Sequence, residues 1–98
     1  MAKIRHIAMF TLKDGADPSR VTAALDLLRD NVPGPTRSTY GPDAALRAGN
    51  AGYGACCDFQ DEATYKTWDK DPEHDRIRRE LVAPHVSAVQ RCPFVIHD

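Results

Sequence analysis

The sequence predicts an α+β domain of the ferredoxin-like class, with a four-stranded antiparallel sheet and helices on one of its faces. Strand-like and helix-like segments follow one another in the order strand, helix, strand, strand, helix, strand, which is the split βαβ arrangement. The first strand also carries apolar residues on both faces, as a strand covered on both sides does. The 98 residues provide one modest core, so we expect a single domain over residues 1–98.

The first strand is predicted over residues 3–13, an apolar segment that ends at Asp14 and Gly15. Alternate residues form one face of this strand: Ile4, His6, Ala8, Phe10 and Leu12. Ile7 and Met9 lie on the other face. Because helices cover only one face of the sheet, we expect a homodimer in which two sheets pack face to face and close a dimeric α/β barrel.

A helix is predicted after Asp17, whose side chain can accept a hydrogen bond from a free backbone N–H. Pro18 suits the first helical position. Apolar residues recur at helical spacing: Val21, Ala24, Leu25 and Leu28. Prolines and a glycine in residues 32–36 end this helix, and a short strand is expected at residues 37–40. An exposed loop should then cover residues 45–52.

The second half of the chain begins with a strand over residues 53–59, followed by an acidic segment that starts a second helix. Pro72 interrupts the helical path, and a further helix is predicted from about Glu73 to Val82. The segment from Ser87 onward predicts the last strand, which Pro93 confines to a sheet edge or a bulge.

His74 is predicted to face the protein interior. In the last helix, charges pair at four-residue spacing, Asp75 with Arg79 and Arg76 with Glu80. The opposite stripe of the helix is formed by His74, Ile77 and Leu81.

Composition excludes several classes of function. The 13 basic and 14 acidic residues are spread along the chain, so we expect no nucleic-acid partner. No apolar run approaches the roughly 20 residues of a membrane span, and no signal peptide is recognisable, which predicts no membrane association and a cytoplasmic location. The three cysteines show no metal-binding spacing and are expected to be reduced, structural thiols.

Two histidines are the candidates for chemistry. An imidazole with a pKa near 6.5 can accept or release a proton at neutral pH, as enolisation of a carbonyl compound or an aldol closure requires. His74 and His6 facing one cavity would supply a base and a polar anchor, although either can instead be a structural histidine bonded to nearby backbone. His85 and His97 are expected to be non-catalytic, and no metal site is predicted.

The chain resembles the stress-responsive A/B barrel (Dabb) domains, which are dimeric α/β-barrel proteins. The resemblance covers nearly the whole sequence and rests on IRHIAMFTLKDGAD, GYGACCDFQDEATYKTW and DPEHDRIRRELVAPHV. Its most specific elements are His6 in the first strand, the Pro72-x-His74 element and the downstream Pro84. The resemblance implies a ferredoxin-like fold and a homodimer built through the sheets.

The resemblance also implies site residues, because a plant polyketide cyclase of this family closes its ring by aldol condensation. The cyclase's catalytic base corresponds to His74, and a pocket histidine of its first strand corresponds to His6. Its assisting tyrosine falls at Trp68, which has no hydroxyl, and a further pocket histidine falls at Ala55. Tyr65 lies one helical turn before Trp68 and is a possible substitute.

The sequence therefore predicts a homodimer that binds a small apolar or aromatic carbonyl ligand, as a cofactor-free polyketide-type cyclase with His74 as general base. Pocket residues are expected to be His6, Phe10, Tyr53, Tyr65 and Trp68, although for Tyr53 and Trp68 core packing is favoured over a place in the pocket or the dimer seam. Two alternatives stay open. One is a non-catalytic, stress-responsive ligand-binding dimer, and the other is a cofactor-free oxygenase or isomerase of the same superfamily.

Overall fold

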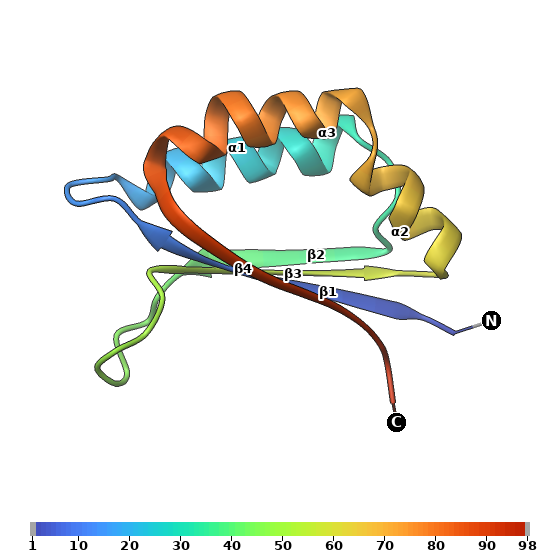
Figure 1. Ribbon diagram of the computed structural model, residues 1–98, viewed down its shortest axis with the longest axis horizontal. Coiled ribbons are helices and arrows are strands. Elements are labelled where there is room, and N and C mark those ends of the chain that lie inside the picture. The colour runs from blue at the N-terminus through green and yellow to red at the C-terminus, as the bar shows by residue number, and fades with distance from the viewer. Residues whose placement is uncertain (1, 98) are drawn as a thin grey trace.

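The computed structural model, which describes residues 2–97, confirms the predicted fold class (Figure 1). Four antiparallel strands form one sheet in the order β2-β3-β1-β4, and the helices lie on one face of it. The elements are β1 (Ile4–Leu12), α1 (Pro18–Asn31), β2 (Arg37–Pro42), β3 (Tyr53–Phe59), α2 (Glu62–Asp69), α3 (Pro72–Ile77) and β4 (Val86–Val95). A π-helical turn (Arg78–Val82) and a 3-10 turn (Ala83–His85) join α3 to β4.

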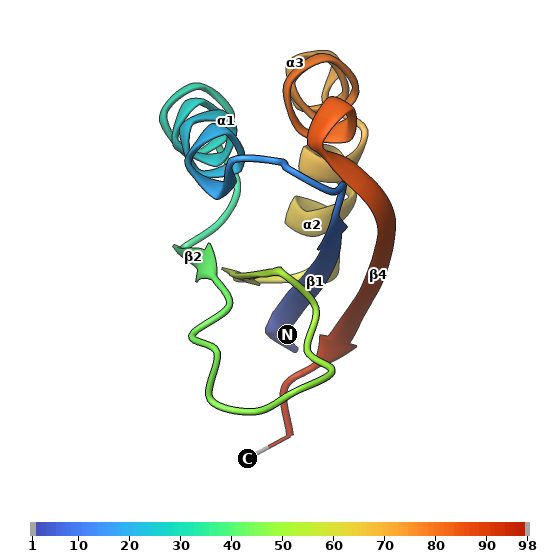
Figure 2. The ribbon, with the colours of Figure 1, turned by 90° about the vertical axis from the view of Figure 1, so that its left-hand side faces the viewer.

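Strand β1 is central in the sheet, as its two apolar faces predict. It pairs with β3 on one side and with β4 on the other. Ile4, Ala8 and Phe10 are buried beneath the helices, whereas Met9 on the outer face is 46% exposed. Strand β4 is an edge strand, as Pro93 predicts, and Figure 2 shows it curving from the end of the helices around one side of the sheet.

Helix α1 begins where the sequence predicts. Asp17 accepts a hydrogen bond from the backbone N–H of Ser19 at 2.9 Å, and Pro18 occupies the first turn. Beyond the helix, Gly34 has φ +147°, and a Cβ at this position would lie 3.0 Å from the Cβ of Trp68. The glycine therefore allows the backbone to pass close to the indole.

The last helix differs from the prediction of a regular helix to Val82. Helix α3 ends at Ile77, and the backbone N–H of Ala83 then donates to the carbonyl oxygen of Arg78, five residues earlier. Pro84 has no N–H to donate and its ring would clash with the carbonyl oxygen four residues earlier, so the regular α-helical pattern does not continue to this position. The chain instead forms the wider π-helical turn over Arg78–Val82. Ala83 itself keeps helical dihedral angles.

This change of helix geometry also corrects one predicted ion pair. Arg79 Nε lies 3.5 Å from Asp75 Oδ2, as expected. The predicted pairing of Arg76 with Glu80 is wrong, because Arg76 Nε donates to Glu73 Oε1 at 2.7 Å instead. The π-helical turn begins between positions 76 and 80, so these residues do not keep α-helical spacing.

The core lies between the helices and the inner face of the sheet. Its main cluster contains Ala8, Phe10, Val21, Ala24, Leu25, Tyr53, Ile77 and Val82. A second cluster, formed by Ile4, Val32, Phe59 and Trp68, lies under α2. Among the described residues, the only buried polar side chains are those of His6 and His74.

The outer face of the sheet carries no helix (Figures 1 and 2). The pairing register places Ile7 opposite Cys56 and Cys92 on this face. All three cysteines are free thiols, and Cys92 is exposed in the single chain. The predicted loop at residues 45–52 projects beyond this face in Figure 1, with Leu46 89% exposed. No helix within residues 2–97 is long and apolar enough to cross a membrane.

Candidate functional site

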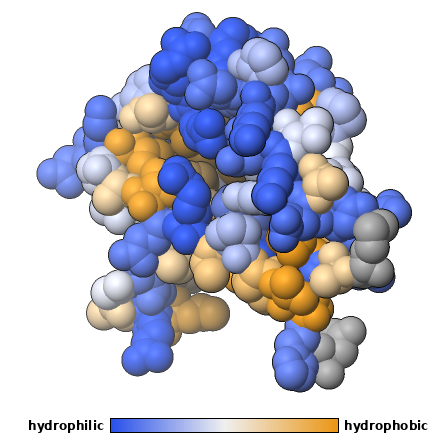
Figure 3. Space-filling view, turned by 45° about the vertical axis from the view of Figure 1, so that its right-hand side comes forward, coloured by the Kyte–Doolittle hydropathy of each residue, from blue (hydrophilic) through white to orange (hydrophobic). Residues whose placement is uncertain are grey.

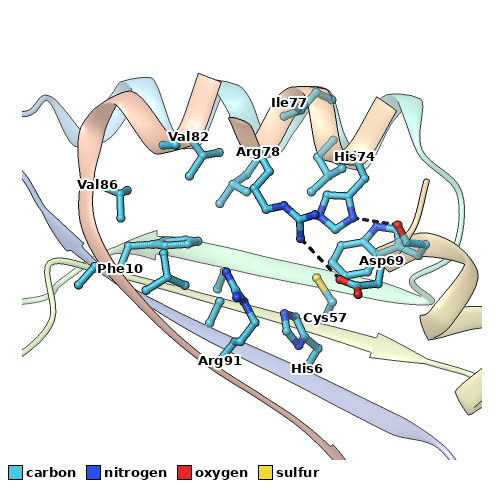
Figure 4. Close-up of a pocket in the computed structure, with 18 of the residues that line it drawn as sticks. His6, Phe10, Cys57, Asp69, His74, Ile77, Arg78, Val82, Val86 and Arg91 are labelled. Carbon is cyan, nitrogen blue, oxygen red and sulfur yellow. Dashed lines mark hydrogen bonds and ion pairs between the residues drawn. The ribbon is translucent and has the colours of Figure 1, made fainter. Parts of the chain in front are cut away.

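A cavity of about 360 Å³ lies between the helices and the inner face of the sheet (Figure 4). Most of its wall is apolar and comes from α1, β1, β3, β4 and the end of the helical segment after α3. Its polar or charged lining residues are His6, Asp69, His74, Arg78, Ser87 and Arg91. The volume suits a small organic ligand, since such sites are usually concave and mostly apolar with few polar groups.

His74 reaches this cavity from the first turn of α3. Asp71 begins the helix by accepting hydrogen bonds from the backbone N–H groups of Glu73 at 2.8 Å and His74 at 3.2 Å. The imidazole Nδ1 lies 2.8 Å from the carbonyl oxygen of Trp68, and the ring lies against the Trp68 indole with centroids 4.0 Å apart. The hydrogen bond and the contact with the indole together hold the imidazole ring in one orientation.

The bond to Trp68 also assigns the tautomer of His74. A carbonyl oxygen can only accept a hydrogen bond, so Nδ1 must carry the proton. In the neutral ring, Nε2 then has a free lone pair and can act as a base. A ring whose Nδ1 is held by an acceptor thus presents Nε2 as the nitrogen available for proton abstraction.

His6 lies on the opposite wall, on β1. Its side chain is 9% exposed, and its Nδ1 has no hydrogen-bond partner within residues 2–97. The ring contacts those of Tyr65 and Trp68, with centroids 5.5 Å and 5.8 Å apart. Leaving a buried polar atom unpaired costs about 1–3 kcal/mol, so a ligand group that bonds to His6 would remove this penalty.

The electrostatic surroundings keep both histidines neutral at pH 7. Burial lowers the pKa of His74 below its ordinary value, opposed by the bond to the Trp68 carbonyl and reinforced by Arg78. Burial also lowers the pKa of His6, opposed by Asp69 and reinforced by Arg91. On the same wall, burial raises the pKa of the Cys57 thiol, so this cysteine stays protonated and is a poor nucleophile.

These shifts predict that the fold loses stability as the pH falls below the ordinary histidine pKa of 6.5. In that range the unfolded chain binds protons to His6 and His74 while the folded chain does not, so the free energy of unfolding decreases. Above 6.5 both states are neutral at these positions and the histidine contribution is constant. Urea unfolding between about pH 5 and pH 8 measures this. A free energy of unfolding that does not change between pH 7 and pH 5 would contradict the assignment.

Three charged residues of the cavity were not predicted from the sequence: Asp69, Arg78 and Arg91. Arg78 lies one helical turn after His74, and its Nη1 is 3.6 Å from Asp69 Oδ1. Arg91 comes from β4, where the register pairs it with Ala8 on the inner face. The four-residue spacing between His74 and Arg78 indicates that both lie on the same face of the helical segment. The alternation of side chains along β4 indicates that Arg91 lies on the inner face of the sheet.

The predicted pocket residues divide into two groups. His6, Phe10, Trp68 and His74 line the cavity. Tyr53 and Tyr65 are not among its lining residues. The Tyr53 hydroxyl forms a 2.6 Å hydrogen bond with Thr22 Oγ1 inside the core, and the Tyr65 ring packs behind His6 and Trp68. The functional roles assigned to all six residues stay predictions.

The structure is a ferredoxin-like α+β domain with a mostly apolar cavity between its helices and its sheet. The family model of the stress responsive A/B barrel domain, Dabb, matches residues 4–95, so the chain belongs to this family. Comparison with curated protein sequences finds no match.

Solved structures share this architecture over almost the whole chain. A dimeric ferredoxin-like protein of unknown function from Thermobifida fusca is 26% identical, with a TM-score of 0.83 over 97% of this chain and 92% of that chain. This similarity supports a homodimer. Hydroxynitrile lyase from Passiflora edulis is 16% identical, with a TM-score of 0.83 over 99% and 95% of the two chains. SnoaB, a cofactor-independent oxygenase from Streptomyces nogalater, is 15% identical, with a TM-score of 0.76 over 100% and 96%. At these identities, the likeness to the lyase and the oxygenase shows the fold alone.

Proposed function

We propose that this protein is a cofactor-free enzyme that removes a proton from a small carbonyl compound, with His74 as the general base, as a polyketide-type aldol cyclase does. The observation that carries the proposal is the hydrogen bond between His74 Nδ1 and the Trp68 carbonyl. It leaves the basic nitrogen of a neutral, buried imidazole free in a cavity whose wall is mostly apolar. The mostly apolar wall suits a substrate with an alkyl or aromatic body.

The proposed step balances without a cofactor. His74 Nε2 takes a proton from the carbon next to a carbonyl group, and the electron pair of the broken C–H bond moves onto the carbonyl oxygen. The resulting enolate carbon then bonds to a second carbonyl carbon of the same molecule. The protonated His74 returns its proton to the new alkoxide. His6, with its unpaired Nδ1, is the candidate anchor for a carbonyl or hydroxyl oxygen of the substrate.

The proposed enzyme is a cytoplasmic homodimer whose interface is the outer face of the sheet. The apolar side chains of Ile7 and Met9 lie near the middle of this face, and no helix covers them. The loop at residues 45–52 projects from the same side (Figure 1) and would lie beside the second copy. The cavity is on the opposite side of the sheet, so each protomer keeps its own site.

Hydrogen–deuterium exchange at carbon tests the proposed reaction before the natural substrate is known. The protein is incubated in D₂O, in the presence of a chelator, with a panel of alkyl and aryl ketones, 1,3-diketones and linear polyketo compounds. We expect at least one class to exchange the proton next to its carbonyl group faster than in buffer, measured by NMR. If no compound exchanges although compounds of the panel bind, the proposed reaction is wrong.

A ligand-binding protein without turnover is the second candidate. The observation that favours it is the same His74 bond, because an imidazole that joins α3 to the end of α2 also fixes the turn between these helices. Binding without exchange in the panel would establish this function. Oxygen uptake with phenols or hydroquinones, recorded on the same samples, would instead indicate a cofactor-free oxygenase.

A further inference from the structure

Charge is unevenly distributed in the cavity. In Figure 4, Asp69, His74 and His6 lie toward one end, Arg78 and Arg91 lie centrally, and Phe10, Val82 and Val86 lie toward the other end. The two arginines against one aspartate leave one net positive charge, because both histidines are neutral. A ligand that fits this distribution has an apolar body and one negative group.

The two arginines differ in their partners. Arg78 lies 3.6 Å from Asp69 and 3.4 Å from Asp75, so carboxylates already compensate its charge. Arg91 lines the same cavity, and within residues 2–97 it forms no ion pair or side-chain hydrogen bond. Arg91 is therefore the cation of the cavity that remains available to a ligand.

The position of Arg91 lowers the desolvation energy that binding of an anion costs. The residue is on the edge strand β4 and is exposed, so an anion bound to it stays partly hydrated. Burying an isolated anion deeper, beside Phe10 and Val82, would cost several kcal/mol. Figure 3 shows apolar side chains on the left of the molecule, below its hydrophilic upper part. The wall of the cavity is itself mostly apolar and matches an apolar body rather than a second charge.

We propose that the ligand of this cavity is a keto acid whose single carboxylate is bound by Arg91 and whose apolar remainder lies against the apolar wall of the cavity. This inference rests on the proposed function, since it names the substrate class of the same site. A guanidinium can donate two parallel hydrogen bonds to a carboxylate. A doubly charged phosphate would need a second uncompensated cation, which the described part of the cavity does not offer.

Binding of matched acids and esters tests this assignment. Trp68 is the one tryptophan of the chain and lines the cavity, so its fluorescence reports binding. The probes are 4-oxo-4-phenylbutanoate and 4-oxodecanoate, each compared with its methyl ester at low salt. We expect each acid to bind about tenfold tighter than its ester, which is the size of a charge-assisted hydrogen bond.

Variants identify the residue responsible. Arg91→Met should remove the preference for the acid, and Arg91→Lys should restore part of it. Arg79→Met is the matched control, because Arg79 is exposed, lies next to Arg78 in the chain and does not line the cavity. The Arg79→Met variant should keep the full preference for the acid over its ester.

Each other result overturns a defined part of the proposal. Esters that bind as tightly as acids would overturn the carboxylate site and leave the reaction of His74 open to the exchange experiment. An Arg91→Met variant that keeps the preference would overturn the role of Arg91. If neither acid nor ester of either pair changes the Trp68 fluorescence, the assignment of the cavity to keto acids is wrong.

Discussion

Replacing His74 with asparagine is expected to lower the rate of carbon–hydrogen exchange by about 10²- to 10⁴-fold, the usual contribution of a general base. Asparagine places an N–H donor close to the position of Nδ1, so it can keep the bond to the Trp68 carbonyl. It has no basic nitrogen in the position of Nε2. The variant thus removes the base while preserving the anchor of the α2–α3 turn.

The pH dependence of the exchange rate identifies the same group. Because burial lowers the pKa of His74, the wild-type rate should rise with pH up to that lowered pKa and stay level above it. His85→Asn is the matched control, since His85 lies beyond Pro84 and is not a lining residue. A His74→Asn variant that stays folded and exchanges at the wild-type rate would show that another group is the base.

Replacing Ile7 with lysine is expected to convert the dimer into monomers. Ile7 lies on the central strand of the uncovered face, opposite Cys56 and Cys92 on the neighbouring strands. If this face is the interface, the lysine of each protomer must be desolvated in it, which costs several kcal/mol per charge. The dissociation constant should therefore increase at least about 100-fold, as measured by sedimentation equilibrium or native mass spectrometry.

A lysine on the other side of the molecule is the control for this experiment. Leu27 is a 44% exposed residue of α1, so Leu27→Lys adds the same charge to the helix layer. The dimer should be unaffected by it. Dissociation by Leu27→Lys together with a stable Ile7→Lys dimer would place the interface on the helices, and a monomeric wild-type protein would contradict the homodimer itself.

The predictable features of this fold depend on local patterns. The two-sided character of β1, the Asp17 and Pro18 start of α1 and the edge position of β4 follow from alternation, capping and the missing N–H of Pro93. The inward orientation of His74 follows from the helical stripe that it shares with Ile77. Each of these properties is decided by residues within a few positions of one another.

The local patterns do not specify how two elements are placed relative to each other. Tyr53 lies in the core, the role favoured for it from its residue type, but its hydrogen bond to Thr22 Oγ1 on α1 could not be read from the sequence. Tyr65 contacts His6, which is 59 positions away in the sequence, and does not line the cavity. Packing between helix and sheet selects these partners, and no spacing along the chain specifies them.

The sequence by itself determined the order of the elements, the uncovered face of the sheet and the two histidines that lie in the interior. Only the tertiary structure decided which charges share their cavity. Arg91 and Asp69 look like ordinary surface residues within their own segments, and they meet His6 and His74 because β4 pairs with β1 while α2 and α3 pack above the sheet. The free lone pair of His74 likewise depends on a carbonyl oxygen six residues away, whose position the turn between two helices sets.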